Sequence, residues 1–230
     1  MLMSGLKSIK LMNYKSLLLK EWKGQNDPSH DLAHIERVLR SALLISEQEG
    51  GSLDVIIPSV WFHDLINLPK NHAERHKASE YSANRAIELL KEQGLEDDKI
   101  LSEIHHAILA HSFSAGVESR TIEAKIVQDA DRLDSLGCIG MMRTFAVSGI
   151  LGRPLFDLDD PFARHRDLDD ASYALDHFEV KLFKIAQTLN TKTAQDIAQE
   201  RVSYMKAFLE RLEDEIIEQP QALAAISASS

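Results

Sequence analysis

The chain has 230 residues, of which 44% are hydrophobic, and a formal net charge of −10. That length suits one large domain or two small ones, and the negative charge disfavours binding to nucleic acid or to an anionic membrane. The single cysteine, Cys138, excludes an intrachain disulfide and a thiolate metal cluster. No apolar stretch is long enough to span a bilayer. These features together predict a cytoplasmic protein with neither a membrane nor a nucleic-acid partner.

The first part of the chain shows the apolar period of amphipathic helices. A first helix is predicted over about residues 9–22, and the segment at residues 1–14 lacks the continuous apolar core and the cleavage site of a signal peptide. A second helix follows, capped by Asp27 or Ser29 and ended by the glycine pair at 50–51. A third is predicted to contain the apolar run at residues 60–65.

The remaining chain also has the patterns of helices and none of strands. Residues 148–170 form the longest irregular stretch, and loops of that length are often functional lids or binding loops. We therefore expect one all-α domain over residues 1–220, a helical bundle, with a flexible tail at 221–230. The further helices are predicted at about residues 74–93, 97–111, 121–136, 171–189 and 193–218.

The run at residues 60–65, with the sequence VWFHDL, places a His-Asp pair among apolar neighbours. Those neighbours indicate that His63 and Asp64 point into protein, where a carboxylate beside an imidazole is costly unless something pairs with it. A divalent cation suits a neutral imidazole and an ionised carboxylate together. We therefore expect His63 and Asp64 to hold a metal.

Two other side chains of the ligand type border buried helix faces. His34 lies beside the apolar face of the second helix, and Asp131 lies between inward-facing Ala130 and Leu133. Taken singly, His34 could be a satisfied helix histidine, and Asp131 could pair only with Arg132. Together with the His-Asp pair they make two imidazoles and two carboxylates, which suit Mn, Mg, Fe, Co, Ni or Zn and leave positions for water and substrate.

These residues resemble a known family. His34, the His63-Asp64 pair and Asp131 match the H…HD…D signature of the HD-domain phosphohydrolases. The neighbouring segments are similar to a small stand-alone bacterial subgroup: residues 30–38, 111–114, 128–134, 160–162 and 177–178. The resemblance implies a bundle of the HD-domain type with its motif core at about residues 29–140. It also implies that His34, His63, Asp64 and Asp131 bind one divalent metal, for which manganese is slightly preferred.

Three further residues are candidates for contact with substrate. His111 closes an inward-facing helix and is a candidate proton donor to a leaving oxygen. Lys77 and Arg132 are candidates for binding a phosphate group. The alternative for each is a solvated or capping role.

Three more residues lie one turn from a predicted ligand. Asp31 could orient the imidazole of His34, and Asp134 could hold Arg132 in place. His30 could line the same cavity or belong to a second metal site, and we expect a single metal.

The resemblance to nucleotide pyrophosphohydrolases predicts that a nucleoside triphosphate is hydrolysed to monophosphate and pyrophosphate. The metal would lower the pKa of a water and withdraw charge from phosphoryl oxygens. The alternatives are a nucleoside monophosphate phosphatase or other phosphoesterase, and a non-enzymatic, metal-stabilised nucleotide sensor that uses residues 148–170 for contact. A small phosphorylated substrate is the expected partner, and the chain is expected to be a monomer or a homodimer.

Overall fold

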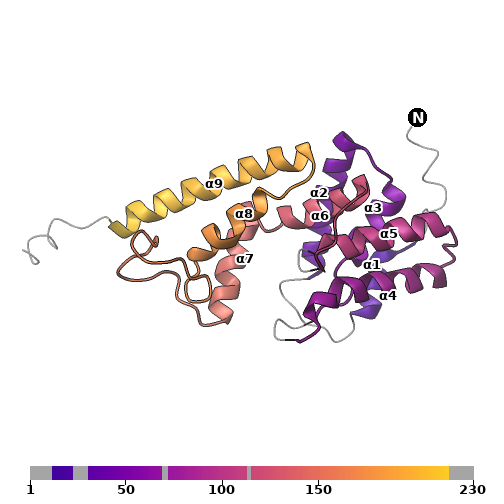
Figure 1. Ribbon diagram of the computed structural model, residues 1–230, viewed down its shortest axis with the longest axis horizontal. Coiled ribbons are helices and arrows are strands. Elements are labelled where there is room, and N and C mark those ends of the chain that lie inside the picture. The colour runs from indigo at the N-terminus through magenta and orange to yellow at the C-terminus, as the bar shows by residue number, and fades with distance from the viewer. Residues whose placement is uncertain (1–11, 23–30, 69–71, 113–114, 218–230) are drawn as a thin grey trace, which may run out of the picture.

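The computed structural model describes residues 12–22, 31–68, 72–112 and 115–217 (Figure 1). No strand occurs in these ranges, so the predicted all-α fold is confirmed. None of the described helices is long and apolar enough to cross a bilayer. A 3-10 turn, η2 (Arg75–Lys77), precedes α4, and a π-helical segment, η4 (Phe178–Leu182), precedes α8. The α-helices are α1 (Tyr14–Glu21), α2 (Leu32–Glu49), α3 (Leu53–Phe62), α4 (Ala78–Glu92), α5 (Asp98–His111), α6 (Ile122–Leu133), α7 (Gly137–Ile150), α8 (Phe183–Ala186) and α9 (Lys192–Ile217).

Side-chain caps set the start of the helices that carry the site. Asp31 begins α2, and its Oδ1 accepts a hydrogen bond from the backbone N–H of His34 at 2.8 Å. Asp27 and Ser29, the caps predicted for this helix, lie outside the described residues, as does the predicted tail at 221–230. Thr121 caps α6 as predicted. These caps satisfy backbone donors that have no partner within the first helical turn.

Helix α3 is buried on most of its surface because it lies between two hydrophobic cores. Val55 and Phe62 face a core built with α1, α4 and α5. Ile56 and Val60 face the other core, which α2 and α6 share with α7, α8 and α9. A helix that is apolar nearly all round fits such an interior position. The residues that follow its last turn are therefore delivered to the middle of the molecule.

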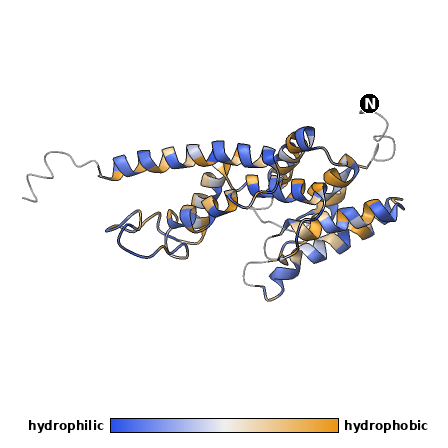
Figure 2. Ribbon diagram, turned by 45° about the horizontal axis from the view of Figure 1, so that its top comes forward, coloured by the Kyte–Doolittle hydropathy of each residue, from blue (hydrophilic) through white to orange (hydrophobic). Residues whose placement is uncertain are grey.

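Figure 1 shows helices α1 to α6 gathered in one body, with α7, α8 and α9 extending away from it. The long helix α9 contacts α2 and α6 in the body and α7 and α8 in the extension. In Figure 2 the apolar residues of α9 line the side that faces these helices, and its polar residues line the opposite side. The second core therefore runs from the body into the extension.

The helix predicted over residues 171–189 is wrong in its first part. Residues 171–175 form turns and irregular structure, and helical structure begins only at Asp176, just before η4. The buried carboxylate of Asp176 explains the difference, because it accepts two hydrogen bonds from the guanidinium of Arg166 and one from the backbone N–H of Asp169. Such side-chain contacts hold the backbone in turns and compete with a helix.

Candidate metal centre

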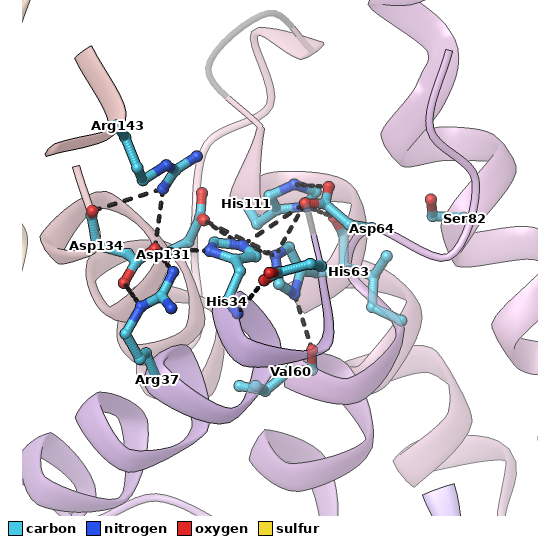
Figure 3. A network of polar contacts seen from close by, with 12 residues as sticks. His34, Arg37, Val60, His63, Asp64, Ser82, His111, Asp131, Asp134 and Arg143 are labelled. Atoms are coloured by element: carbon cyan, nitrogen blue, oxygen red, sulfur yellow. Dashed lines mark hydrogen bonds and ion pairs between the residues drawn. The ribbon is translucent and has the colours of Figure 1, made fainter. Parts of the chain in front are cut away.

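Four helices bring their ends together beside the buried α3. His34 lies in the first turn of α2, and His63 and Asp64 directly follow α3. His111 is the last residue of α5, and Asp131 lies in the last turn of α6. Figure 3 shows these five side chains converging on one point. The structure thus brings together all four predicted metal ligands and the predicted proton donor.

The distances between the ligand atoms fit a single ion. Nε2 of His34 lies 3.3 Å from Nε2 of His63 and 3.5 Å from Oδ1 of Asp131. Nε2 of His63 lies 3.3 Å from Oδ2 of Asp64 and 3.8 Å from Oδ1 of Asp131. Ligands that lie about 2.0–2.2 Å from one metal are separated by about 3.0–3.6 Å. Three of these four separations lie in that range and the fourth lies slightly above it, so the donor set and its spacing fit a divalent cation.

The three histidines present the same ring nitrogen to the cluster. Nδ1 of His63 and Nδ1 of His111 each donate to the backbone carbonyl three residues earlier, at 2.8 and 2.6 Å. Nδ1 of His34 donates to Oδ2 of Asp134 at 2.8 Å. Because these oxygens only accept, the proton of each neutral ring is held on Nδ1, and the lone pair of Nε2 faces the cluster.

The electrostatics of the cluster favour a positive charge at its centre. Burial lowers the pKa of the His63 imidazole, but the carboxylates of Asp64 and Asp131 outweigh burial and raise the pKa to about 9. The His34 and His63 side chains are 1% and 0% exposed, whereas those of Asp64 and Asp131 are 19% and 28% exposed. The imidazoles thus form the base of the site, and the carboxylates lie toward solvent, where a substrate can approach.

Asp134 orients the His34 ring and is itself held by two arginines. Besides the bond from His34, it accepts hydrogen bonds from Arg37 at 2.7 and 2.9 Å and from Arg143 at 2.9 Å. Burial raises the pKa of the Asp134 carboxyl, but the hydrogen bonds from His34 and Arg37 and the charge of Arg143 outweigh burial and hold the pKa well below its usual range. A carboxylate behind a ligand imidazole fixes the orientation of the ring and increases its basicity.

The contact predicted between Asp134 and Arg132 is wrong. Nη1 of Arg132 donates to the carbonyl and the hydroxyl of Thr188, at 2.6 and 3.1 Å, in the connection between α8 and α9. Sequence reasoning missed Arg37 and Arg143 as the partners of Asp134. For Arg37 a signal was present, because it lies one turn after His34 on the same helix.

The other predicted residues lie around the cluster in different ways. Asp31 caps the backbone of His34 and does not bond its ring, so the contact predicted for it is also corrected. Lys77 pairs with Glu74 at 3.0 Å, and both side chains are more than 40% exposed. No contact between Lys77 and the cluster occurs in the part of the chain that the structure describes. His30 lies outside that part.

Comparisons with known proteins agree with this geometry. The HD domain family profile matches residues 31–136, which include all five cluster residues. The uncharacterized protein YpgQ of Bacillus subtilis strain 168 is 31% identical over 203 residues, which cover 88% of this chain and 89% of that one. The chain belongs to the HD-domain family.

Two solved structures of similar proteins extend the likeness to nearly the whole fold. An HD-superfamily hydrolase from Bacillus thuringiensis is 32% identical, with a TM-score of 0.70 over 90% of this chain and 96% of that one. Bacillus subtilis YpgQ, solved in complex with ADP, is 28% identical, with a TM-score of 0.66 over 89% and 93% of the two chains. The similarity of this HD-domain protein to the two solved structures therefore includes the extension formed by α7, α8 and α9.

Proposed function

We propose that this HD-domain protein is a metal-dependent phosphohydrolase that cleaves a nucleoside triphosphate into a monophosphate and pyrophosphate. The observation that carries the proposal is the convergence of histidine Nε2 atoms and two carboxylates on one point near the surface. Its relatives support it, since one is described as a hydrolase and another was solved with a nucleotide, ADP.

His34, His63, Asp64 and Asp131 would hold the metal, for which manganese is preferred among the ions that suit imidazole and carboxylate ligands. When bound, a divalent cation lowers the pKa of a water and withdraws charge from phosphoryl oxygens. The protein's own part is to fix the ligands before the ion arrives. The Asp134 carboxylate and two backbone carbonyls do so by setting the tautomer of each ring.

His111 is proposed to supply the proton to the leaving oxygen. Its Nδ1 is committed to the carbonyl of Ile108, so Nε2 is the ring atom that takes or gives a proton. That atom lies 3.6 Å from Oδ1 of Asp64, which places it at the edge of the metal ligands. General acids must lie within reach of the group they protonate, and this position meets that need.

Arg37 and Arg143 are proposed to attract the triphosphate. Two guanidinium groups contact the carboxylate of Asp134, so two positively charged side chains lie beside the cluster. A protein of net charge −10 needs such a local field to draw in a polyanion. We assign this part to them in place of Arg132, whose guanidinium is bonded to Thr188. Lys77 stays a prediction for substrate contact.

The test is to identify the products of turnover. Purified protein is incubated with nucleoside triphosphates and with Mn, Mg, Co, Ni, Fe or Zn in turn, and the products are separated by ion-exchange chromatography. Monophosphate and pyrophosphate in equal amounts are expected. Nucleoside and inorganic phosphate from a monophosphate, with triphosphates untouched, would replace the proposal by a phosphatase. No turnover of any phosphate ester or anhydride, despite stoichiometric metal, would instead favour a nucleotide sensor.

A further inference from the structure

A second group of cationic side chains lies on elements that carry none of the cluster residues. Two backbone hydrogen bonds, of 3.0 and 2.9 Å, join residues 154–155 of the loop after α7 to residues 174–175 before η4. This pairing sets Arg153, at the start of the joined segment, beside the turn that contains His177. Lys181 follows His177 by about one helical turn, within the π-helical η4. Segments of π-helix occur often at functional sites.

Arg153 carries an unsatisfied buried atom. Its Nε is buried and has no hydrogen-bond partner among the residues that the structure describes. A buried guanidinium nitrogen without an acceptor costs free energy, so native proteins normally provide one. This chain has 36 acidic residues and only 26 lysines and arginines, so carboxylates are abundant. Even so, no ion pair to Arg153 or Lys181 occurs within the described ranges, so both cations are open to an anionic partner.

His177 lies within the electrostatic influence of both cations. Its Nδ1 lies 2.8 Å from Oδ2 of Asp170, which holds the proton on Nδ1 and leaves Nε2 for another partner. Burial lowers the pKa of the His177 imidazole, and the positive charges of Lys181 and Arg153 lower it further against the effect of Asp170. Arg153 and Lys181, which form no ion pair among the described residues, therefore both act on the ring. An anion between them would relieve that repulsion and favour a proton on Nε2.

We propose that Arg153, His177 and Lys181 form a second anion site, which binds a phosphate group. A guanidinium offers paired donors that match the oxygens of phosphate, and an ammonium adds a point charge. The phosphate group could belong to the substrate of the proposed hydrolysis or to a separate phosphorylated effector. None of these three residues belongs to the metal cluster, so the binding can be tested without metal and without turnover.

The experiment uses the full chain after removal of metal by a chelator and dialysis, with inorganic pyrophosphate as the probe. Binding is measured by calorimetry for the wild type, Lys181→Gln and Lys184→Gln. Both lysines are exposed, so neither change should impair folding, and Lys184 on α8 is the matched control. We expect Lys181→Gln to weaken saturable binding about tenfold, as for loss of one charge-assisted hydrogen bond, and Lys184→Gln to change it less than about twofold.

The ring resonances of His177, followed by NMR, give a second readout. They should move toward those of an imidazolium as pyrophosphate is added to the wild type. Equal affinity in the wild type and Lys181→Gln, or unmoved His177 resonances, would overturn the proposal. The source of the phosphate group follows from kinetics with a triphosphate. A raised KM in Lys181→Gln at unchanged kcat assigns the site to the substrate, whereas unchanged kinetics with lost pyrophosphate binding assigns it to an effector.

Discussion

Asp134 shows how one buried side chain prepares the chemistry of several others. Its carboxylate bonds the ring of His34 and two guanidinium groups, from α2 and from α7. Each bond satisfies a polar group that would otherwise be costly to bury. The carboxylate therefore sets the direction of a metal ligand and keeps positive charge beside the site. Roles at this scale depend on which atom of a side chain faces the cluster.

The first prediction separates His111 from the metal ligands. Because its Nε2 lies 3.6 Å from Asp64 at the edge of the ligand set, His111→Ala should slow turnover by about 10²–10⁴-fold, as expected for loss of a general acid, while metal content stays stoichiometric. Asp131→Ala should lose the metal and the activity together. Elemental analysis and single-turnover rates measure both. If metal content falls with the rate in His111→Ala, this histidine is a ligand and its assigned role is wrong.

The corner between α6 and α7 is the element that places Asp134. The chain turns at Gly137, whose φ of 70° is a backbone conformation that residues other than glycine rarely adopt. Just beyond it, a Cβ added to Gly140 would lie 2.1 Å from the carbonyl oxygen of Ser135. Backbone cannot yield as a flexible side chain does, so the connecting turn and the first turn of α7 approach this closely only with glycine at position 140.

Gly140→Ala is therefore predicted to destabilise the protein by about 1–3 kcal/mol, the usual cost of overpacking, and to weaken metal binding through the displaced corner. Gly149→Ala, on the same helix, is the control because an added Cβ there meets nothing within 4 Å. Its stability should be unchanged or slightly raised. Denaturant unfolding and metal titration of both variants decide the matter, and equal stability of the two would refute the steric argument.

Helix α1 packs against α3 through Tyr14, whose ring lies edge-on to that of Phe62 with 5.8 Å between the ring centroids. Burial, with a smaller effect of Asp54, raises the pKa of the Tyr14 hydroxyl to about 12. An unfolded tyrosine ionises near pH 10. The stabilisation from keeping this hydroxyl neutral is thus fully present below pH 10 and is lost as the pH rises from 10 to 12.

Tyr14→Phe should therefore flatten the fall in the free energy of unfolding between pH 10 and 12. Tyr204→Phe, at a position 57% exposed, should keep the wild-type slope. Urea unfolding at several alkaline pH values measures this difference. Parallel curves for the wild type and Tyr14→Phe would show that the hydroxyl titrates alike in both states.

At the scale of the whole molecule, the candidate metal site connects several helices of the body formed by α1 to α6. Its five residues come from α2, α5, α6 and the segment after α3. These helices also share the core that extends to α7, α8 and α9. A ligand that binds only the folded state stabilises all elements that build its site. Metal binding and global stability should therefore be coupled.

Chelation is predicted to lower the Tm. A divalent ion at about 100 times its Kd should raise the free energy of unfolding by about 2.7 kcal/mol. For a chain of this size that corresponds to a rise of about 5–10 °C in Tm. Asp131→Ala is the control and should show the same Tm with and without the chelator. Calorimetric scans provide the measurement. If neither the chelator nor the metal changes the Tm of the wild type, the predicted coupling is contradicted.

Local chemistry in the sequence determined the helical fold and the metal-ligand pattern. The 3.6-residue apolar period predicts most of the helices, and His34, the His63-Asp64 pair and Asp131 follow the order of the family signature. The apolar period depends on residues near one another in the chain, and the signature is recognised from the order of its residues, so both can be read without a fold.

Only the tertiary structure decided which groups partner these residues. Asp134 bonds Arg37 at a separation of 97 residues and not the nearby Arg132, which faces a different element. In the same way, Asp176 pairs with Arg166 and opposes the helix that local propensity favours at 171–175. The physical reason is that a buried charge takes the partner that folding places beside it, and sequence distance does not reveal that partner.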